Sequence, residues 1–174
     1  MSLWGNDIKP KNLTDAEKKE VFANTKGWVR EAGSILSGNG NTGADPEVLV
    51  AISNLSANMG AANITEIEFV TTSFDKSDGG NIDVLVRFNE PVTVTGTPRV
   101  SITNGNQGSG SGRGPHLANY LSGSTTNELT FRCTIGAANA ATNAGDILVI
   151  GTSATALNSG TIKDTGEGTV ATIT

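Results

Sequence analysis

The stretch NIDVLVRFNEPVTVTG, residues 81–96, decides the fold of this chain. Apolar side chains at Ile82, Val84, Val86 and Phe88 alternate with Asp83, Leu85 and Arg87. Strict alternation over seven residues indicates a strand with one buried face. Pro91 follows and lacks a backbone N–H, so it marks either a strand end or a kink where the chain crosses between sheets. This unit fixes the register of the C-terminal two thirds.

The composition favours short strands joined by many turns. Gly accounts for 22 of 174 residues, while aromatic residues are 5% and charged residues 17% of the chain. Such a composition suits turns and short strands better than long helices. Alternation and turn signals predict eight strands, at Ile64–Phe74, Ile82–Phe88, Val92–Thr95, Arg99–Thr103, His116–Leu121, Glu128–Ile135, Ile147–Ile150 and Val170–Ile173. We therefore predict an all-β fold, an immunoglobulin-like β-sandwich of seven or eight strands.

The first third of the chain follows a different pattern. Thr14 and Glu17 form a capping box, which predicts a short helix from Asp15 to about Asn24. Brief strands are expected at Trp28–Val29 and at Glu47–Ile52. Such a segment has a small core. We therefore expect it to be stabilised by docking on its own sandwich, on a sister subunit or on a different protein.

These patterns divide the chain into three parts. Residues 1–56 form an N-terminal anchoring segment, residues 57–63 a linker of small residues, and residues 64–174 the immunoglobulin-like domain. Trp4, Phe22 and Trp28 are candidate partner-binding residues, because aromatic side chains dominate the energetics of docking surfaces. The alternative for these three aromatic residues is a small core packed onto the sandwich.

Charge and targeting signals narrow the classes of partner. The net charge is −5 and no basic stripe is present, which argues against nucleic-acid binding. Cys133 is the single cysteine and lies in an alternating run, which predicts a small core residue. The sequence shows no signal peptide and no apolar run of membrane-spanning length. We expect synthesis in the cytoplasm without membrane insertion.

Two parts of the chain resemble known families. The order FNEPVTVTGTPRVSI, ANYLSGSTTNELTFRCTI and AGDILVIGTSATALNSGTIKDTGEG resembles a bacterial immunoglobulin-like repeat, as in the swimming-motility surface protein of marine cyanobacteria. The segments MSLWGN, KPKNLT, KGWV and PEVLVAI are similar to the opening of short virion structural proteins from tailed phages of marine cyanobacteria. The chain departs from the repeat family in its long tip, residues 104–114, and in having a single copy. Together the resemblances imply a virion surface protein with an N-terminal anchor.

Several clusters of residues suggest chemistry and have simpler explanations. Asp75, Asp78 and Asp83 surround a Gly turn and offer oxygen ligands for calcium, but the spacing is not that of an EF-hand loop and a hairpin turn explains it. His116 with Cys133 is a nucleophile pair only if the two side chains reach each other, and Cys133 is expected in the core. Candidate glycosidase acids are Glu66, Glu68, Glu90 and Glu128. Solvated strand faces explain these glutamates, so no catalytic residue or cofactor is assigned.

Three functional hypotheses follow. The first is a decoration or cement protein that docks on a phage shell, with the major capsid protein or other virion proteins as partners. Many copies, or a homo-oligomer, are then expected on the virion surface. The second is a tail or fibre adhesion module that binds a host glycan or protein through the 104–114 tip. The third is an unusual hydrolase.

Overall fold

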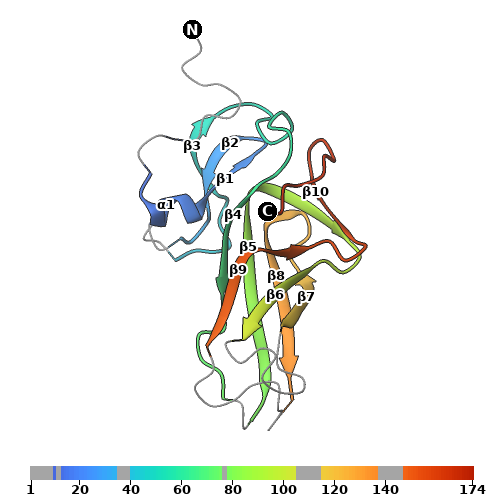
Figure 1. Cartoon of the computed structure of the whole chain (residues 1–174). Coiled ribbons are helices and arrows are strands. Elements are labelled where there is room, and N and C mark those ends of the chain that lie inside the picture. Colours follow the sequence, from blue (N-terminus) through green and yellow to red (C-terminus); the bar gives the residue numbers. More distant parts are fainter. Residues whose placement is uncertain (1–9, 11–12, 35–39, 76–77, 105–114, 137–146) are drawn as a thin grey trace.

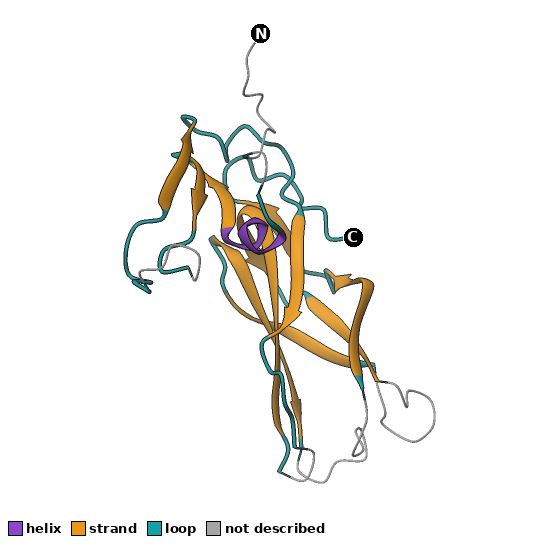
Figure 2. Ribbon diagram, turned by 90° about the vertical axis from the view of Figure 1, so that its left-hand side faces the viewer, coloured by secondary structure: helices purple, strands orange, loops and turns teal. Residues whose placement is uncertain are grey.

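The computed structural model describes residue 10 and residues 13–34, 40–75, 78–104, 115–136 and 147–174. Among these residues the chain is mostly β, with one short helix and two sheets (Figure 1). A small three-stranded sheet and the helix lie at one end, and a seven-stranded sheet forms the rest (Figures 1 and 2). The predicted all-β class is confirmed.

The N-terminal unit is a helix followed by a three-stranded antiparallel sheet. Helix α1 (Asp15–Glu20) starts at the predicted capping box, in which the Thr14 hydroxyl accepts from the Glu17 amide at 3.2 Å. Strands β1 (Val21–Asn24), β2 (Gly27–Arg30) and β3 (Glu47–Ala51) follow in the order β1-β2-β3. The prediction of a helix to about Asn24 is wrong at its C-terminal end. Residues 21–24 pair with 27–30 and their apolar side chains are buried there.

The larger sheet contains the remaining strands. They are β4 (Ile64–Phe69), β5 (Gly80–Thr95), β6 (Arg99–Asn104), β7 (His116–Ser122), β8 (Thr126–Ile135), β9 (Leu148–Ala156) and β10 (Thr161–Asp164). Their order is β10-β5-β8-β7-β6-β9, and β4 pairs with β5. Figure 1 shows β6 and β9 crossing in front of β5 and β8, and buried residues of β5, β6, β7, β8, β9 and β10 share one core. The arrangement is therefore sandwich-like.

Strand β5 confirms the alternation that the sequence predicts. The side chains at 82, 84, 86 and 88 are at most 1% exposed, while those at 83, 85 and 87 are half-buried. The strand continues through Pro91, but its pairing with β8 shifts register between Arg87 and Val92. Before the shift its neighbours are β4 and β8, and after it Val92–Thr95 pairs with β10. A strand end at Pro91 is therefore wrong, and the residue lies instead within a register shift of a continuous strand.

Near the C-terminus one predicted strand is absent and one observed strand was not predicted. The expected strand at 170–173 consists of isolated bridges only, from Val170 to Lys163 and from Thr172 to Asn63. Strand β10 was not predicted, because Ile162 is its single fully buried apolar side chain and gives no alternation to detect.

The segment predicted as a linker connects two separate cores. Leu55 and Met59 pack with the N-terminal unit, whereas Ala62 is buried in the core of the larger sheet. The backbone then joins β5, since the Asn63 amide donates to Asn89 Oδ1 at 2.6 Å. Among the described residues no helix has both the length and the apolar character needed to span a bilayer.

Candidate functional site

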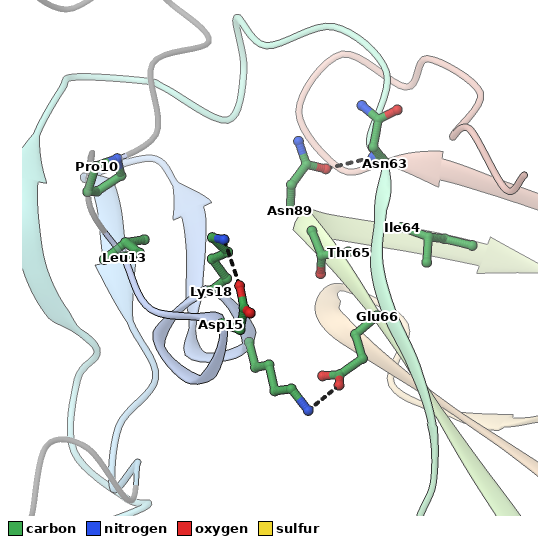
Figure 3. Close-up of a pocket in the computed structure, with 10 residues that line it drawn as sticks. Pro10, Leu13, Asp15, Lys18, Asn63, Ile64, Thr65, Glu66 and Asn89 are labelled. Atoms are coloured by element: carbon green, nitrogen blue, oxygen red, sulfur yellow. Dashed lines mark hydrogen bonds and ion pairs between the residues drawn. The ribbon is translucent and has the colours of Figure 1, made fainter.

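A cleft separates α1 from β4, where the N-terminal unit meets the larger sheet (Figure 3). Its volume is about 810 Å³, within the range of ligand-binding clefts. One wall comes from the N-terminal unit and the other from β4 and the adjoining part of β5. The lining residues are Pro10, Leu13, Asp15, Lys18, Lys19, Asn63, Ile64, Thr65, Glu66 and Asn89.

The β4 wall is an irregular stretch at the start of the strand. Four consecutive residues, 63–66, line the cleft. The pairing of β4 with β5 shifts register between Ile64 and Glu66, and such an irregularity brings consecutive side chains to one side. Thr172 bridges Asn63, and the Thr172 amide donates to the Ala62 carbonyl at 2.7 Å. The C-terminal segment therefore covers the outer side of this stretch at its start.

Ion pairs close one end of the cleft. Lys19 Nζ on α1 lies 2.5 Å from Glu66 Oε1 on β4. Arg87 Nη1 contacts Glu66 at 2.9 Å and Glu68 at 2.5 Å, and Arg87 Nε contacts Glu128 at 2.6 Å. The hydrogen bond to Glu66 raises the pKa of Lys19. This arrangement fixes α1 beside the edge of β4.

A second contact joins the N-terminal unit to β8. Asn127 Nδ2 donates to Glu31 Oε1 at 3.5 Å, and the Glu31 carboxyl also hydrogen-bonds to Glu128. Burial, together with the charge of Glu128, raises the pKa of Glu31 to about 7, although Arg87 acts in the opposite direction. Burial and a neighbouring carboxylate both disfavour the ionised form of Glu31 at this seam, whereas the Asn127 donor favours it.

Glu90 is a separate buried carboxyl group. It is 0% exposed, and neither oxygen has a hydrogen-bond partner among the described residues. Burial, followed by the charges of Asp164 and Glu167, raises the pKa of Glu90 to about 7. Of the four candidate glycosidase acids, Glu66, Glu68 and Glu128 instead converge on Arg87. They act there as counter-ions of one guanidinium.

The proposed calcium ligands have other roles in the structure. Asp83 binds Arg132 through two hydrogen bonds of 2.7 Å, and hydrogen bonding to Arg132 holds the pKa of Asp83 below its usual range. The Asp75 carbonyl accepts from the Gly79 amide at 3.1 Å, and Gly79 has a φ of 69°. A turn at these residues is the alternative to a calcium site that the sequence analysis gives. No group of three metal-binding side chains occurs among the described residues.

His116 and Cys133 are both integrated into the sheet. The buried His116 ring lies 3.3 Å, at Nε2, from Asn104 Nδ2. Cys133 is half-buried, and burial raises the pKa of its thiol. A raised pKa is the opposite of what an activated cysteine nucleophile requires. The tip at residues 105–114 lies outside the described residues.

Two of the three predicted anchor residues lie in the interior. Trp28 is 0% exposed and packs in a core with Val21, Ala23 and Leu55. Phe22 is 9% exposed, and Trp4 lies outside the described residues. For Phe22 and Trp28 the structure therefore supports the alternative of a small core, since a side chain buried in its own chain offers no surface to a partner.

Two cations that organise the ion pairs beside the cleft, Lys19 and Arg87, were not predicted from the sequence. Arg87 was recognisable as the one cation on the polar face of the central strand, among strands rich in glutamate. Lys19 gave no signal, because its role depends on where α1 lies in space. Comparisons with protein-family models, with curated proteins and with solved structures give no match for this chain.

Proposed function

We propose that the chain is a virion structural protein, most simply a decoration protein that docks on a phage shell and displays an immunoglobulin-like domain. Support comes from the two resemblances and from one structural observation. The chain has two cores, one around Trp28 and one around β5, joined by a short crossing at residues 57–63. A small unit with its own core beside a larger β body suits an anchor that carries a displayed domain.

The structure modifies how the anchor is expected to work. Trp28 stabilises the N-terminal unit from within, Phe22 is buried, and the polar contacts of Lys19 and Glu31 hold the unit against the larger sheet. The anchoring surface must then be formed by outward groups of this unit and by the seam beside it. A partner that binds the folded chain stabilises both protein and particle by mass action.

The experiment is quantitative mass spectrometry of purified virions from the source that encodes this sequence. Decoration predicts a copy number comparable with that of the main shell protein, and loss of the chain when residues 1–56 are deleted. A few copies that fractionate with tails, or none at all, contradict decoration. The same deletion leaves residues 57–174 as a control for expression.

A second candidate, an adhesion module, is favoured by a surface observation. Leu117 on β7 and Val149 on β9 pair with Ser101 and Thr103, so they share the outer face of the sheet, and they are 39% and 50% exposed. Large exposed apolar side chains on one face are typical of interaction surfaces. A glycan array tests this function, with Leu117→Ser and Val149→Ser as the matched control. Binding that the double variant loses supports adhesion, and absence of binding supports decoration.

A further inference from the structure

We propose that the seam between the N-terminal unit and the larger sheet is a pH-controlled hinge, which opens about residues 60–61 when the Glu31 carboxyl group loses its proton. The N-terminal unit, formed by α1, β1, β2 and β3, then turns away from the larger sheet and uncovers an apolar face. The hinge is a property of the chain alone, so it does not depend on the proposed function.

First, the connection between the two bodies narrows to two residues. Met59 packs with the N-terminal core, and Ala62 is buried in the core of the larger sheet. Between them lies Gly60, which has a φ of 83°, and nothing in the described chain lies within 4 Å of the position that a Cβ would occupy, its chain neighbours apart. A glycine in open space absorbs a change of backbone angle at low cost. The unit can therefore turn about Gly60 and Ala61 without disturbing either core.

A close contact beside the hinge marks the pivot. Gly166, in the turn that follows β10, approaches the start of the crossing so closely that a Cβ there would lie 2.8 Å from Ala57 Cα and 2.9 Å from the Ser56 carbonyl oxygen. A contact only a few residues from Gly60 is displaced little when the unit rotates. The rotation therefore opens the seam around this point rather than pulling the two bodies apart.

Second, the face that the N-terminal unit turns toward the larger sheet is partly apolar. Phe22 and Val29 are paired in the β1–β2 ladder and are 9% and 0% exposed, but neither belongs to the two cores. Alternation places them on the side of the small sheet opposite Trp28. Glu31, two residues after Val29, contacts Asn127 on β8, and β1 lies beside β5. This side of the small sheet therefore faces the larger sheet.

Third, the polar contacts of the seam carry an excess of carboxyl groups. Among the described residues, four carboxyl groups meet two cations there, namely Glu31, Glu66, Glu68 and Glu128 with Lys19 and Arg87. The excess is two negative charges (4 − 2) when all four carboxyl groups are ionised, and one (3 − 2) when Glu31 is protonated. The Lys19 side chain is 48% exposed, so its pair with Glu66 stabilises the seam only weakly.

The charged groups around Glu31 come from both sides of the seam. They are Glu128 on β8, Arg87 on β5, Glu66 and Glu68 on β4, Lys19 and Glu20 on α1, and Arg30 on β2, which pairs with Glu17 and Glu47. Burial, together with the charge and the hydrogen bond of Glu128, raises the pKa of Glu31 from 4.5 to about 7, while Arg87 and the Asn127 donor act against this rise.

The direction of the response follows from this raised pKa. The closed state holds the proton of Glu31 more tightly than the open state does, so the closed state is favoured in full below about pH 4.5 and loses this advantage as the pH rises through about 7. The full rise of about 2.5 pKa units (7 − 4.5) corresponds to about a 300-fold change in the ratio of open to closed molecules. Because Glu31 is only half-buried and water screens its charge, we expect about a tenfold change.

The test measures the separation of the two bodies in the full chain by electron paramagnetic resonance. Spin labels are attached at Asp45→Cys in the N-terminal unit and at Leu121→Cys on β7, in a Cys133→Ala background. The Asp45 side chain is 89% exposed and Leu121 is 48% exposed, so both positions accept a label. We expect one narrow distance at about pH 5.5 and a second, broader population at about pH 8.5, with a ratio of open to closed molecules about tenfold higher.

Two variants at the seam separate the hinge from a general effect of pH. Glu31→Gln keeps an acceptor for Asn127 but carries no charge, so this variant stays closed at both pH values. Glu128→Gln removes the neighbouring negative charge while the burial of Glu31 remains, so this variant opens to a smaller extent than the wild type. It also keeps the proposal testable should Glu31→Gln fail to fold.

Glu90→Gln is the matched control. The pKa of Glu90 is also raised to about 7, but by burial and by the charges of Asp164 and Glu167 rather than by groups of the seam, so this variant still opens. One unchanged distance between the two pH values overturns the proposal, as does opening that both Glu31→Gln and Glu128→Gln retain in full. The proposed function fails separately, if virions lack the chain.

Discussion

Glu90→Gln is expected to remove a large part of the pH dependence of folding stability. Glu90 lies on β5 with 0% exposure, and its carboxyl oxygens have no hydrogen-bond partner among the described residues. Asp164 offers it no donor, because the Asp164 oxygens accept from three backbone amides. An ionised Glu90 carboxylate is therefore removed from water and repelled by the negative charges of Asp164 and Glu167.

The sign and size of the change in unfolding free energy follow from the pKa of Glu90, which is raised from 4.5 to about 7. A raised pKa means that the folded state binds the proton more tightly than the unfolded state. The stabilisation is therefore complete below about pH 4.5 and is lost as the pH rises through about 7. Since one pKa unit corresponds to ~1.36 kcal/mol, the loss approaches about 3 kcal/mol at high pH.

Urea unfolding between about pH 4.5 and pH 8.5 measures this dependence through the unfolding free energy. The neutral amide of Glu90→Gln carries no ionisation cost, so the variant exceeds the wild type by about 1–3 kcal/mol at the alkaline end and matches it at the acidic end. Glu31→Gln is expected to remove a separate share of the pH dependence, because the pKa of Glu31 is also raised to about 7, at the seam between the two units. An unchanged pH dependence in Glu90→Gln refutes the reasoning.

Three further predictions concern stability. Trp28→Ala lowers the unfolding free energy by about 3–5 kcal/mol, because a core side chain is removed, and a loss below about 1 kcal/mol in urea titration contradicts burial. Arg87→Met costs about 3 kcal/mol, since three carboxylates lose the guanidinium that they share and Glu128 keeps no ion pair among the described residues, and Arg132→Met, which frees only Asp83, costs less in the same assay. Calcium at about 5 mM leaves the melting temperature unchanged by calorimetry, because Asp83 is bound to Arg132, and a rise above about 2 °C contradicts this.

The central strands could be predicted because their pattern of buried and exposed side chains appears as alternation in the sequence. Alternation at 82–88 needs no knowledge of distant residues, and a capping box acts over four residues. The end of α1 was mispredicted because Val21 and Phe22 are poor helix formers whose state depends on pairing with β2. Tertiary pairing overrode the helical signal that the capping box began.

The cleft was not predictable from the sequence in the same way. It arises because α1 lies beside a strand that is more than forty residues further along the chain, and Lys19 reaches Glu66 across that gap. The aromatic residues illustrate the same limit. Sequence alone does not distinguish a Trp that docks on a partner from one that fills a small core, and Trp28 proves to be of the second kind.

The central claim, which rests on the proposed function, is that the N-terminal unit holds the chain in a virion. It is tested most directly by photo-crosslinking in purified particles, with p-benzoylphenylalanine in place of Lys18 on α1 and, as control, in place of Leu121, which is 48% exposed on β7. The account predicts a crosslink from position 18 to another virion protein and none from position 121. A crosslink from position 121 with none from position 18 would contradict it.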